Sequence, residues 1–205
     1  MKTDSKHFGL VTKKFNDFFL VDLKNQEISG NSKKFLCKVR KSINFKNQLI
    51  YVGDEVAIEK IDLKSKLAVI TSLKKRKNLL NRPSVANISN IYVTFSVEEP
   101  ELNLSQVNRF LISAESMGVD VSLVLTKCDL ISERRKSYLI DKFEKWGYQV
   151  ITLNLQKSDY FNNLLVELKQ KECSIFMGPS GVGKTTLLNM LIPGLQNSTA
   201  PVSNK

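Results

Sequence analysis

The feature that most constrains this sequence is a glycine-rich segment near its end. Residues 178–185 read Gly-Pro-Ser-Gly-Val-Gly-Lys-Thr and match G-x-x-x-x-G-K-[ST] at every fixed position. An apolar run, Ser174–Met177, precedes the segment, and a run of helical character, Leu187–Leu191, follows it. This order of strand, loop and helix predicts a phosphate-binding loop (P-loop) within an α/β domain. A glycine-rich turn that binds nothing is the alternative.

The residue types in this loop suit phosphate chemistry. Gly178, Gly181 and Gly183 let the backbone wrap tightly, so that several N–H groups point at one phosphate. Lys184 would place its charge on the β and γ phosphates, and the Thr185 hydroxyl would ligate Mg²⁺. The predicted nucleotide-binding set also includes the intervening residues and the next hydroxyl: Pro179, Ser180, Val182 and Thr186.

A second motif, Thr126-Lys127-Cys128-Asp129, closes the apolar run Val121–Leu125. It is similar to the guanine-specificity motif Asn-Lys-x-Asp, with Thr in place of Asn. Two carboxylate oxygens of Asp129 can accept from the N1–H and N2–H₂ groups of guanine, which adenine does not supply. The stem of Lys127 can lie along the base plane. On its own the motif is more typical of a turn at a strand end, but together with a P-loop it predicts guanine recognition.

Strands and helices alternate through the second part of the chain, which predicts a parallel sheet. Gly118 and Gly147 fall just after two of the helices, where a C-terminal cap is expected. The expected strands are Ile91–Val97, Val121–Thr126, Gln149–Leu153 and Cys173–Met177. The expected helices are Leu104–Met117, Glu133–Trp146, Tyr160–Lys169 and Lys184–Leu191.

The first part of the chain shows short strand-like runs separated by turn-prone pieces. About five strands in some 70 residues predict a small barrel of the OB type, and an SH3-like barrel fits the periodicity nearly as well. The expected strands are Phe8–Thr12, Asp17–Asp22, Phe35–Arg40, Glu55–Ile61 and Leu67–Leu73. Four phenylalanines, Phe15, Phe18, Phe19 and Phe35, are candidates either for base stacking or for the barrel core.

Basic residues are concentrated in that first part. Residues 1–77 hold 18 Lys or Arg and 8 Asp or Glu, whereas the other residues hold 13 and 12. This concentration indicates a polyanionic partner such as RNA, DNA or anionic lipid, and a solvated basic surface is the alternative. The run Lys74-Lys75-Arg76-Lys77 is interpreted first as a strand end or linker and only second as a nucleic-acid contact.

Several classes of protein are excluded by what the sequence lacks. No apolar run reaches the length of a membrane span, and residues 1–10 lack the apolar core of a signal peptide. The three cysteines, Cys37, Cys128 and Cys173, show no zinc-site spacing, and His7 is the only histidine. A soluble, cytoplasmic protein without zinc ligands is therefore expected.

The order of the two motifs is informative, because the guanine motif precedes the P-loop. With the basic barrel in front, the chain resembles the ribosome small-subunit-dependent GTPase A family of circularly permuted GTPases. Val52-Gly53-Asp54-Glu55-Val56 and Arg82-Pro83-Ser84-Val85-Ala86-Asn87 are also similar to that family. The resemblance runs from about Gly9 to Lys205. It implies an OB-type RNA-binding barrel over residues 1–77 and a circularly permuted α/β P-loop GTPase domain over residues 78–205.

The resemblance further implies a function. The family binds GTP with Mg²⁺, hydrolyses it slowly alone and faster on the small (30S) ribosomal subunit, and acts late in maturation of that subunit. Its barrel contacts ribosomal RNA. The implied partners are therefore GTP or GDP, the small subunit and its rRNA, without a membrane or DNA, and a monomer is expected.

The sequence departs from the family pattern in three places. Thr126 replaces Asn, although its hydroxyl can still bond the loop backbone, and Asn154-Leu155 stands where a Ser-Ala base-binding loop is expected. The chain stops after the P-loop helix, without switch I, Asp-x-x-Gly or the family's zinc domain.

We therefore expect a truncated, incomplete GTPase domain that binds nucleotide weakly and hydrolyses it poorly, and we identify no catalytic residue. The alternatives are an RNA-binding module with a catalytically crippled nucleotide domain and an ATP-using P-loop kinase.

Overall fold

The computed structural model describes residues 2–3, 6–24, 33–40, 49–81, 83–154 and 161–192. Contacts between residues divide the chain into two compact units, Met1–Ile88 and Ser89–Lys205. The boundary predicted after Lys77 therefore lies within the first unit, and the division into functional domains stays a prediction.

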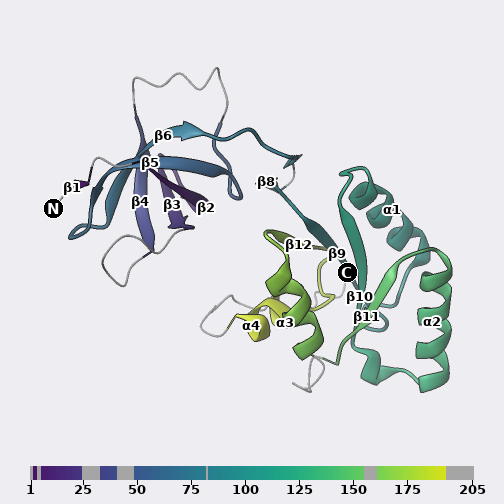
Figure 1. Cartoon of the computed structure of the whole chain (residues 1–205). Coiled ribbons are helices and arrows are strands. Elements are labelled where there is room, and N and C mark those ends of the chain that lie inside the picture. Colours follow the sequence, from purple (N-terminus) through teal and green to yellow (C-terminus); the bar gives the residue numbers. More distant parts are fainter. Residues whose placement is uncertain are drawn as a thin grey trace. The chain divides into compact units, whose positions relative to one another are not determined.

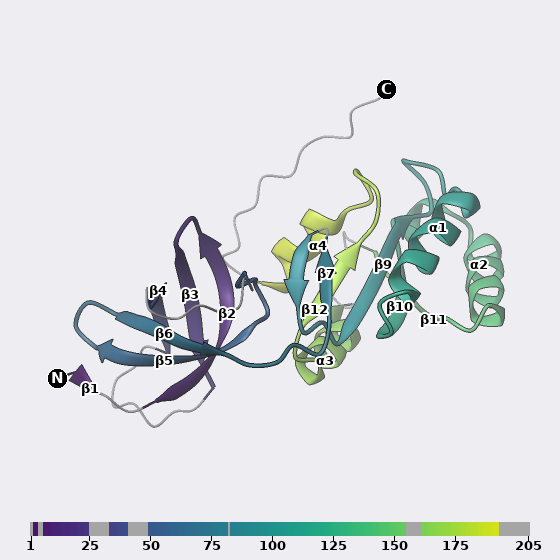
Figure 2. The ribbon, with the colours of Figure 1, turned by 90° about the horizontal axis from the view of Figure 1, so that it is seen from above.

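The first unit is a barrel (Figures 1 and 2). Its strands are β1 (Lys2–Thr3), β2 (His7–Phe15), β3 (Phe18–Leu23), β4 (Lys34–Val39), β5 (Glu55–Asp62) and β6 (Leu67–Leu73). The sheet order is β1-β5-β2-β3-β4-β6, and a further pairing of β5 with β6 closes the last five strands on themselves. The pairing of β4 with β6 is parallel, whereas the other barrel pairings are antiparallel. The closed barrel of five strands confirms the OB-type interpretation.

Alternation of side chains along these strands fills the barrel interior. Along β3, for example, Phe19, Val21 and Leu23 are buried while the residues between them are not. The four candidate phenylalanines divide accordingly: Phe19 and Phe35 lie in the core, whereas Phe15 is 52% exposed and Phe18 is half-buried. The turn predicted at Ile28-Ser29-Gly30-Asn31 lies outside the described residues.

A small hairpin follows the barrel strands and was not predicted. It consists of β7 (Leu79–Asn81) and β8 (Ser84–Ala86), which pair antiparallel. Asn87 beside it donates from Nδ2 to the Gly53 carbonyl across 2.8 Å, and a Cβ at Gly53 would lie 2.0 Å from the Ala86 carbonyl oxygen. The two family-like stretches of this unit are therefore packed directly against each other.

The second unit contains a parallel four-stranded sheet in the order β11-β10-β9-β12. Its strands are β9 (Asn90–Ser96), β10 (Asp120–Thr126), β11 (Gln149–Thr152) and β12 (Ser174–Met177). Every residue of β9 is buried, as expected for a central parallel strand covered on both faces. Among the described residues β12 pairs with β9 alone, so it lies at one end of the sheet order.

Helices cover both faces of this sheet. They are α1 (Leu104–Glu115), α2 (Glu133–Lys145), α3 (Phe161–Gln170) and α4 (Lys184–Leu191), with a 3₁₀ turn η1 (Cys128–Leu130) after β10. The helices α1 and α2 contact β9, β10 and β11, while Leu164 of α3 and Leu187 of α4 join a core with Tyr92 and Val124. Gly118 and Gly147 follow α1 and α2 with φ of +63° and +93°, which confirms the predicted C-terminal caps.

Candidate nucleotide-binding site

The glycine-rich segment lies between β12 and α4, as predicted, and its backbone conformation explains its composition. Gly181 and Gly183 have φ of +83° and +92°, a region that side-chain-bearing residues rarely adopt. A Cβ at Gly178 would lie 2.0 Å from the carbonyl oxygen of Thr94 on the neighbouring strand β9. The loop therefore passes too close to β9 for any residue but glycine at its start.

Lys184 begins α4, and its ammonium group bends back over the loop. Nζ donates to the carbonyls of Gly178 and Pro179 across 2.8 and 2.5 Å. Burial lowers the pKa of Lys184. Because its two acceptors are neutral main-chain groups, an anion at the loop would stabilise the charged form of this lysine better than the loop does.

The other loop residues take different positions. Val182 is buried, Ser180 is exposed, and Thr185 and Thr186 are half-buried in the first turn of α4. A hydroxyl that directly follows the phosphate-binding lysine suits the oxygen-ligand preference of Mg²⁺. Thr185 is therefore the residue of this loop that fits a Mg²⁺ ligand.

The guanine-like motif is joined to the P-loop by one side chain. Thr126, at the carboxyl end of β10, is fully buried and donates from Oγ1 to the Val182 carbonyl across 2.6 Å. The Phe95 carbonyl lies 3.3 Å from the same hydroxyl. The expectation that the threonine hydroxyl bonds the loop backbone is confirmed. Residues 56 positions apart in the chain are thereby brought into contact.

Lys127 is held in the left-handed region at φ +56°, and its Nζ donates to the carbonyl of Glu99 in the loop after β9. The sequence did not indicate this contact, because Glu99 belongs to no recognisable motif and acts through its main chain. An ion pair between Arg135 and Glu98, at 2.5 Å, ties the same loop to α2. The two contacts fix the loop beside the guanine-like motif.

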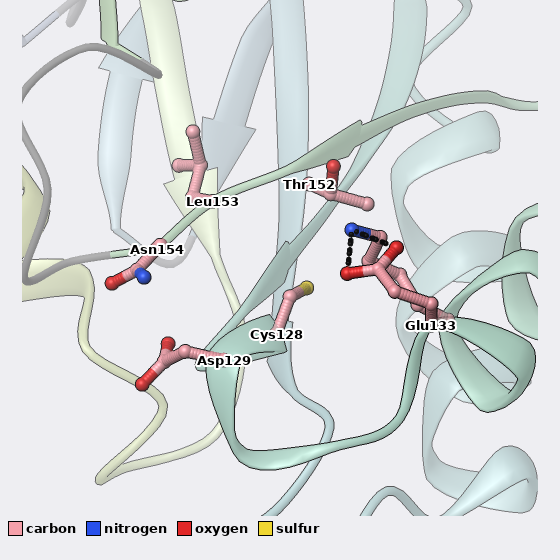
Figure 3. A pocket seen from close by; sticks show the side chains of 7 residues that line it. Cys128, Asp129, Glu133, Thr152, Leu153 and Asn154 are labelled. Carbon is pink, nitrogen blue, oxygen red and sulfur yellow. Dashed lines mark hydrogen bonds and ion pairs between the residues drawn. The ribbon is translucent and has the colours of Figure 1, made fainter.

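Asp129 is exposed in η1 and borders a cavity of about 180 Å³ (Figure 3). Hydrogen bonds from Leu153 N to Leu125 O, at 2.8 Å, and from Cys128 N to Leu153 O, at 3.5 Å, bring the end of β11 against η1. Asn154 consequently lies beside Asp129, whereas Leu155 lies outside the described residues. The cavity is lined by Cys128, Asp129, Glu133, Lys136, Thr152, Leu153 and Asn154.

Cys128 faces away from the Asp129 carboxylate, towards Thr152 (Figure 3). Its thiol is buried and donates to the Leu125 carbonyl across 3.3 Å, and burial raises its pKa to about 11. A protonated, buried thiol packs as a small apolar group. Cys128 can therefore offer a ligand its main chain rather than its sulfur.

Cations and aromatic rings meet on the barrel unit. Lys38 Nζ lies 4.5 Å from the centroid of the Phe18 ring, and Lys74 Nζ lies 5.2 Å from that of Phe8, which is 42% exposed. Such pairs suit a chain of phosphates and bases. Arg76, however, is held by the buried carboxylate of Asp54 at 2.6 Å, so the basic run after β6 is partly structural.

Two further findings concern the described residues only. They contain no group of three or more His, Cys, Asp or Glu side chains arranged to hold a metal ion. None of the helices among them is both long and apolar enough to cross a membrane.

Comparisons with family models and with curated proteins point to the same family. The model of the RsgA GTPase family matches residues 73–205. The small ribosomal subunit biogenesis GTPase RsgA of Prochlorococcus marinus (strain NATL2A) is 34% identical over 204 residues, covering 96% of this chain and 65% of the relative. Its namesake in Synechococcus sp. (strain CC9605) is 38% identical over 172 residues, covering 84% and 57%.

Solved structures agree with the family match. YjeQ from Thermotoga maritima superposes with a TM-score of 0.81 at 29% identity, covering 96% of this chain and 68% of that one. YloQ, described as a circularly permuted GTPase, gives 0.76 at 25% identity, covering 90% and 64%. The chain thus spans about 65% of the length of the first curated relatives.

Proposed function

The chain belongs to the RsgA GTPase family, and from this premise we propose that it binds guanine nucleotide and hydrolyses GTP in the biogenesis of the small ribosomal subunit. The names of its relatives state this role for them. The chain spans about 65% of the length of those relatives. The activity that their names state is therefore proposed for this chain.

The observation that carries the proposal is the hydrogen bond from Thr126 to Val182, at 2.6 Å. It joins a motif suited to guanine with a loop suited to phosphate, at the carboxyl ends of the parallel strands β10 and β12, which flank β9. Ligands of open α/β sheets bind at that end of the strands. A guanine nucleotide has a base and a phosphate chain to fill both parts.

We assign the roles as follows. The backbone of residues 178–183 surrounds the phosphates, and Lys184 exchanges its two carbonyl acceptors for phosphate oxygens. Thr185 supplies a hydroxyl to Mg²⁺, which neutralises charge on the phosphates. Lys127 lies along the base, and Asp129 accepts from its N1–H and N2–H₂ groups. Thr186 and the main chain of Cys128 complete the set of residues proposed to bind the nucleotide.

A titration with fluorescent nucleotides tests the nucleotide part. With Mg²⁺ present, we expect GTP and GDP to bind and ATP to compete at least tenfold more weakly. Equal preference for ATP would favour the P-loop kinase alternative. No binding of either nucleotide would leave the chain an RNA-binding module with a nucleotide-like scaffold.

We further propose that the barrel binds rRNA of the small subunit, and that the chain acts as a cytoplasmic monomer that does not bind DNA. The basic residues of positions 1–77 and the cation–aromatic pairs of Phe8 and Phe18 support this. Affinity of the full chain for small subunits should fall steeply with salt. Binding that is insensitive to salt, or equal for large subunits, would contradict it.

A further inference from the structure

The helix α2 carries two exposed aromatic side chains that the proposed function does not use. Tyr138 is 60% exposed, and Trp146, which caps the helix at its carboxyl end, is 40% exposed. They are eight residues apart, so they lie on one face of the helix about 12 Å apart along its axis. In both views α2 lies at the outside of its unit (Figures 1 and 2).

Lys142 lies between the two rings. Its Nζ is 5.7 Å from the centroid of the Tyr138 ring and 5.8 Å from that of Trp146. Trp146 also packs edge-on against the buried Phe143 ring, with centroids 5.2 Å apart. The row Tyr138–Lys142–Trp146 is therefore an ordered arrangement of ring, cation and ring, because one ring is fixed to the core and the cation contacts both.

The surroundings of this row are positively charged. By helical spacing, the exposed Arg134 and Lys145 lie on the same face, and the structure gives neither of them an ion-pair partner among the described residues. By the same spacing Asp141 is the only carboxylate of α2 that borders the face, and Arg135, which also lies on it, is already paired with Glu98. Glu133, in contrast, is already paired with Lys136 at 2.7 Å. A negatively charged partner would meet uncompensated cations here.

We propose that this face of α2 binds single-stranded RNA, with unpaired bases stacked on Tyr138 and Trp146 and phosphates on Lys142, Arg134 and Lys145. Exposed rings give bases a stacking platform, and the cations between them suit the backbone that joins those bases. A protein partner would match the apolar rings but would leave the cations uncompensated unless it were acidic. The face belongs to the second unit, and its residues are not among those assigned to the nucleotide.

The chain contains its own reporter, because Trp146 is its only tryptophan. An unstructured RNA oligonucleotide of about 12 residues is titrated into the full chain while tryptophan emission and the anisotropy of labelled RNA are followed. Stacking on Trp146 quenches its emission in step with the rise in anisotropy. Full RNA binding with unchanged emission would mean that the barrel alone binds, and would overturn the proposal.

Variants separate the row from the rest of the molecule. Tyr138→Ala should weaken RNA binding about tenfold, while Tyr138→Phe, which keeps the ring, should retain it. Ile112→Ala, at a similarly exposed position on α1, is the matched control and should leave RNA binding unchanged. If Tyr138→Ala weakens binding to small ribosomal subunits but leaves binding to free RNA unchanged, the face contacts protein, and the proposal is wrong.

Discussion

The hydroxyl of Thr126 donates to the carbonyl of Val182 across 2.6 Å, and both residues are buried. This bond connects the end of β10 with the P-loop, and it is made by the residue that stands in place of the motif's asparagine. Because Thr126 is β-branched and fully enclosed, its hydroxyl has little freedom to point elsewhere. The hydroxyl of Thr126 therefore helps to fix the position of the loop relative to the guanine-like motif.

Thr126→Val keeps the shape of the side chain and removes the hydroxyl. It leaves a buried carbonyl unpaired, so the free energy of unfolding should fall by about 1–3 kcal/mol and affinity for GDP by about tenfold. Urea unfolding followed by Trp146 emission and a fluorescent-GDP titration measure the two effects. Thr94→Val removes another buried hydroxyl, whose bond to Tyr92 O stays within β9, and should leave GDP affinity much less changed. Equal affinity losses in both variants would contradict a specific role for Thr126.

Asp129→Asn should change which base is recognised. The amide offers a donor where the carboxylate offers only acceptors, so GTP affinity should fall about 10- to 100-fold and affinity for xanthosine triphosphate should rise. Competition against a fluorescent nucleotide measures both. Asp120→Asn, at the amino end of β10, the strand that precedes the motif, is the control. If Asp129→Asn leaves the order of base preference unchanged, Asp129 does not contact the base.

Gly178→Ala tests the close approach of the P-loop to β9. The new Cβ would lie 2.0 Å from the Thr94 carbonyl oxygen, so the loop must move and nucleotide affinity should be lost. Gly118→Ala meets no atom within 4 Å and bears only the strain of φ +63°, about 1–2 kcal/mol. It should therefore lower stability while preserving GDP affinity. Wild-type affinity in Gly178→Ala would show that the close spacing between the loop and β9 does not matter for binding.

Sequence reasoning succeeded where one pattern determined one structure. The expected strands of the second unit are apolar runs and its expected helices have apolar positions at helical spacing, and the P-loop has a fixed spacing. It failed for β7 and β8, because three-residue strands around Pro83 are too short to show a period. It also missed the Lys127 contact with Glu99, because a main-chain acceptor leaves no trace in residue type. Phe18 and Phe19 show the same limit, since only the barrel register decides which of the neighbouring rings is buried.

Glu55 should make the barrel sensitive to acid. Hydrogen bonds from Lys24 and Lys74, both at 2.8 Å, hold the pKa of its carboxyl at about 2, below its ordinary value of 4.5. A depressed folded pKa stabilises the folded state fully above pH 4.5, and this contribution is lost as the pH falls towards 2. Glu55→Gln should therefore be less stable than wild type at pH 7 and nearly equal to it near pH 2. Denaturation followed by circular dichroism tests this, and a stability difference that is constant from pH 7 to pH 2 would contradict it. Glu101→Gln, at an 80% exposed side chain, is the control.

The last prediction separates structure from nucleic-acid binding within the basic run after β6. Asp54 is fully buried and accepts from Arg76 Nε and Nη2 at 2.6 and 2.7 Å, and from Tyr51 N at 2.8 Å. Arg76→Ala would leave this carboxylate buried without a counterion, which should lower the free energy of unfolding of the barrel by about 3–5 kcal/mol. Lys75→Ala, at the exposed neighbouring position, should leave stability unchanged and reduce RNA affinity and its salt dependence. Circular dichroism melts and RNA anisotropy give the two readouts. If Arg76→Ala remains as stable as wild type and loses RNA affinity instead, its guanidinium contacts nucleic acid rather than supporting Asp54.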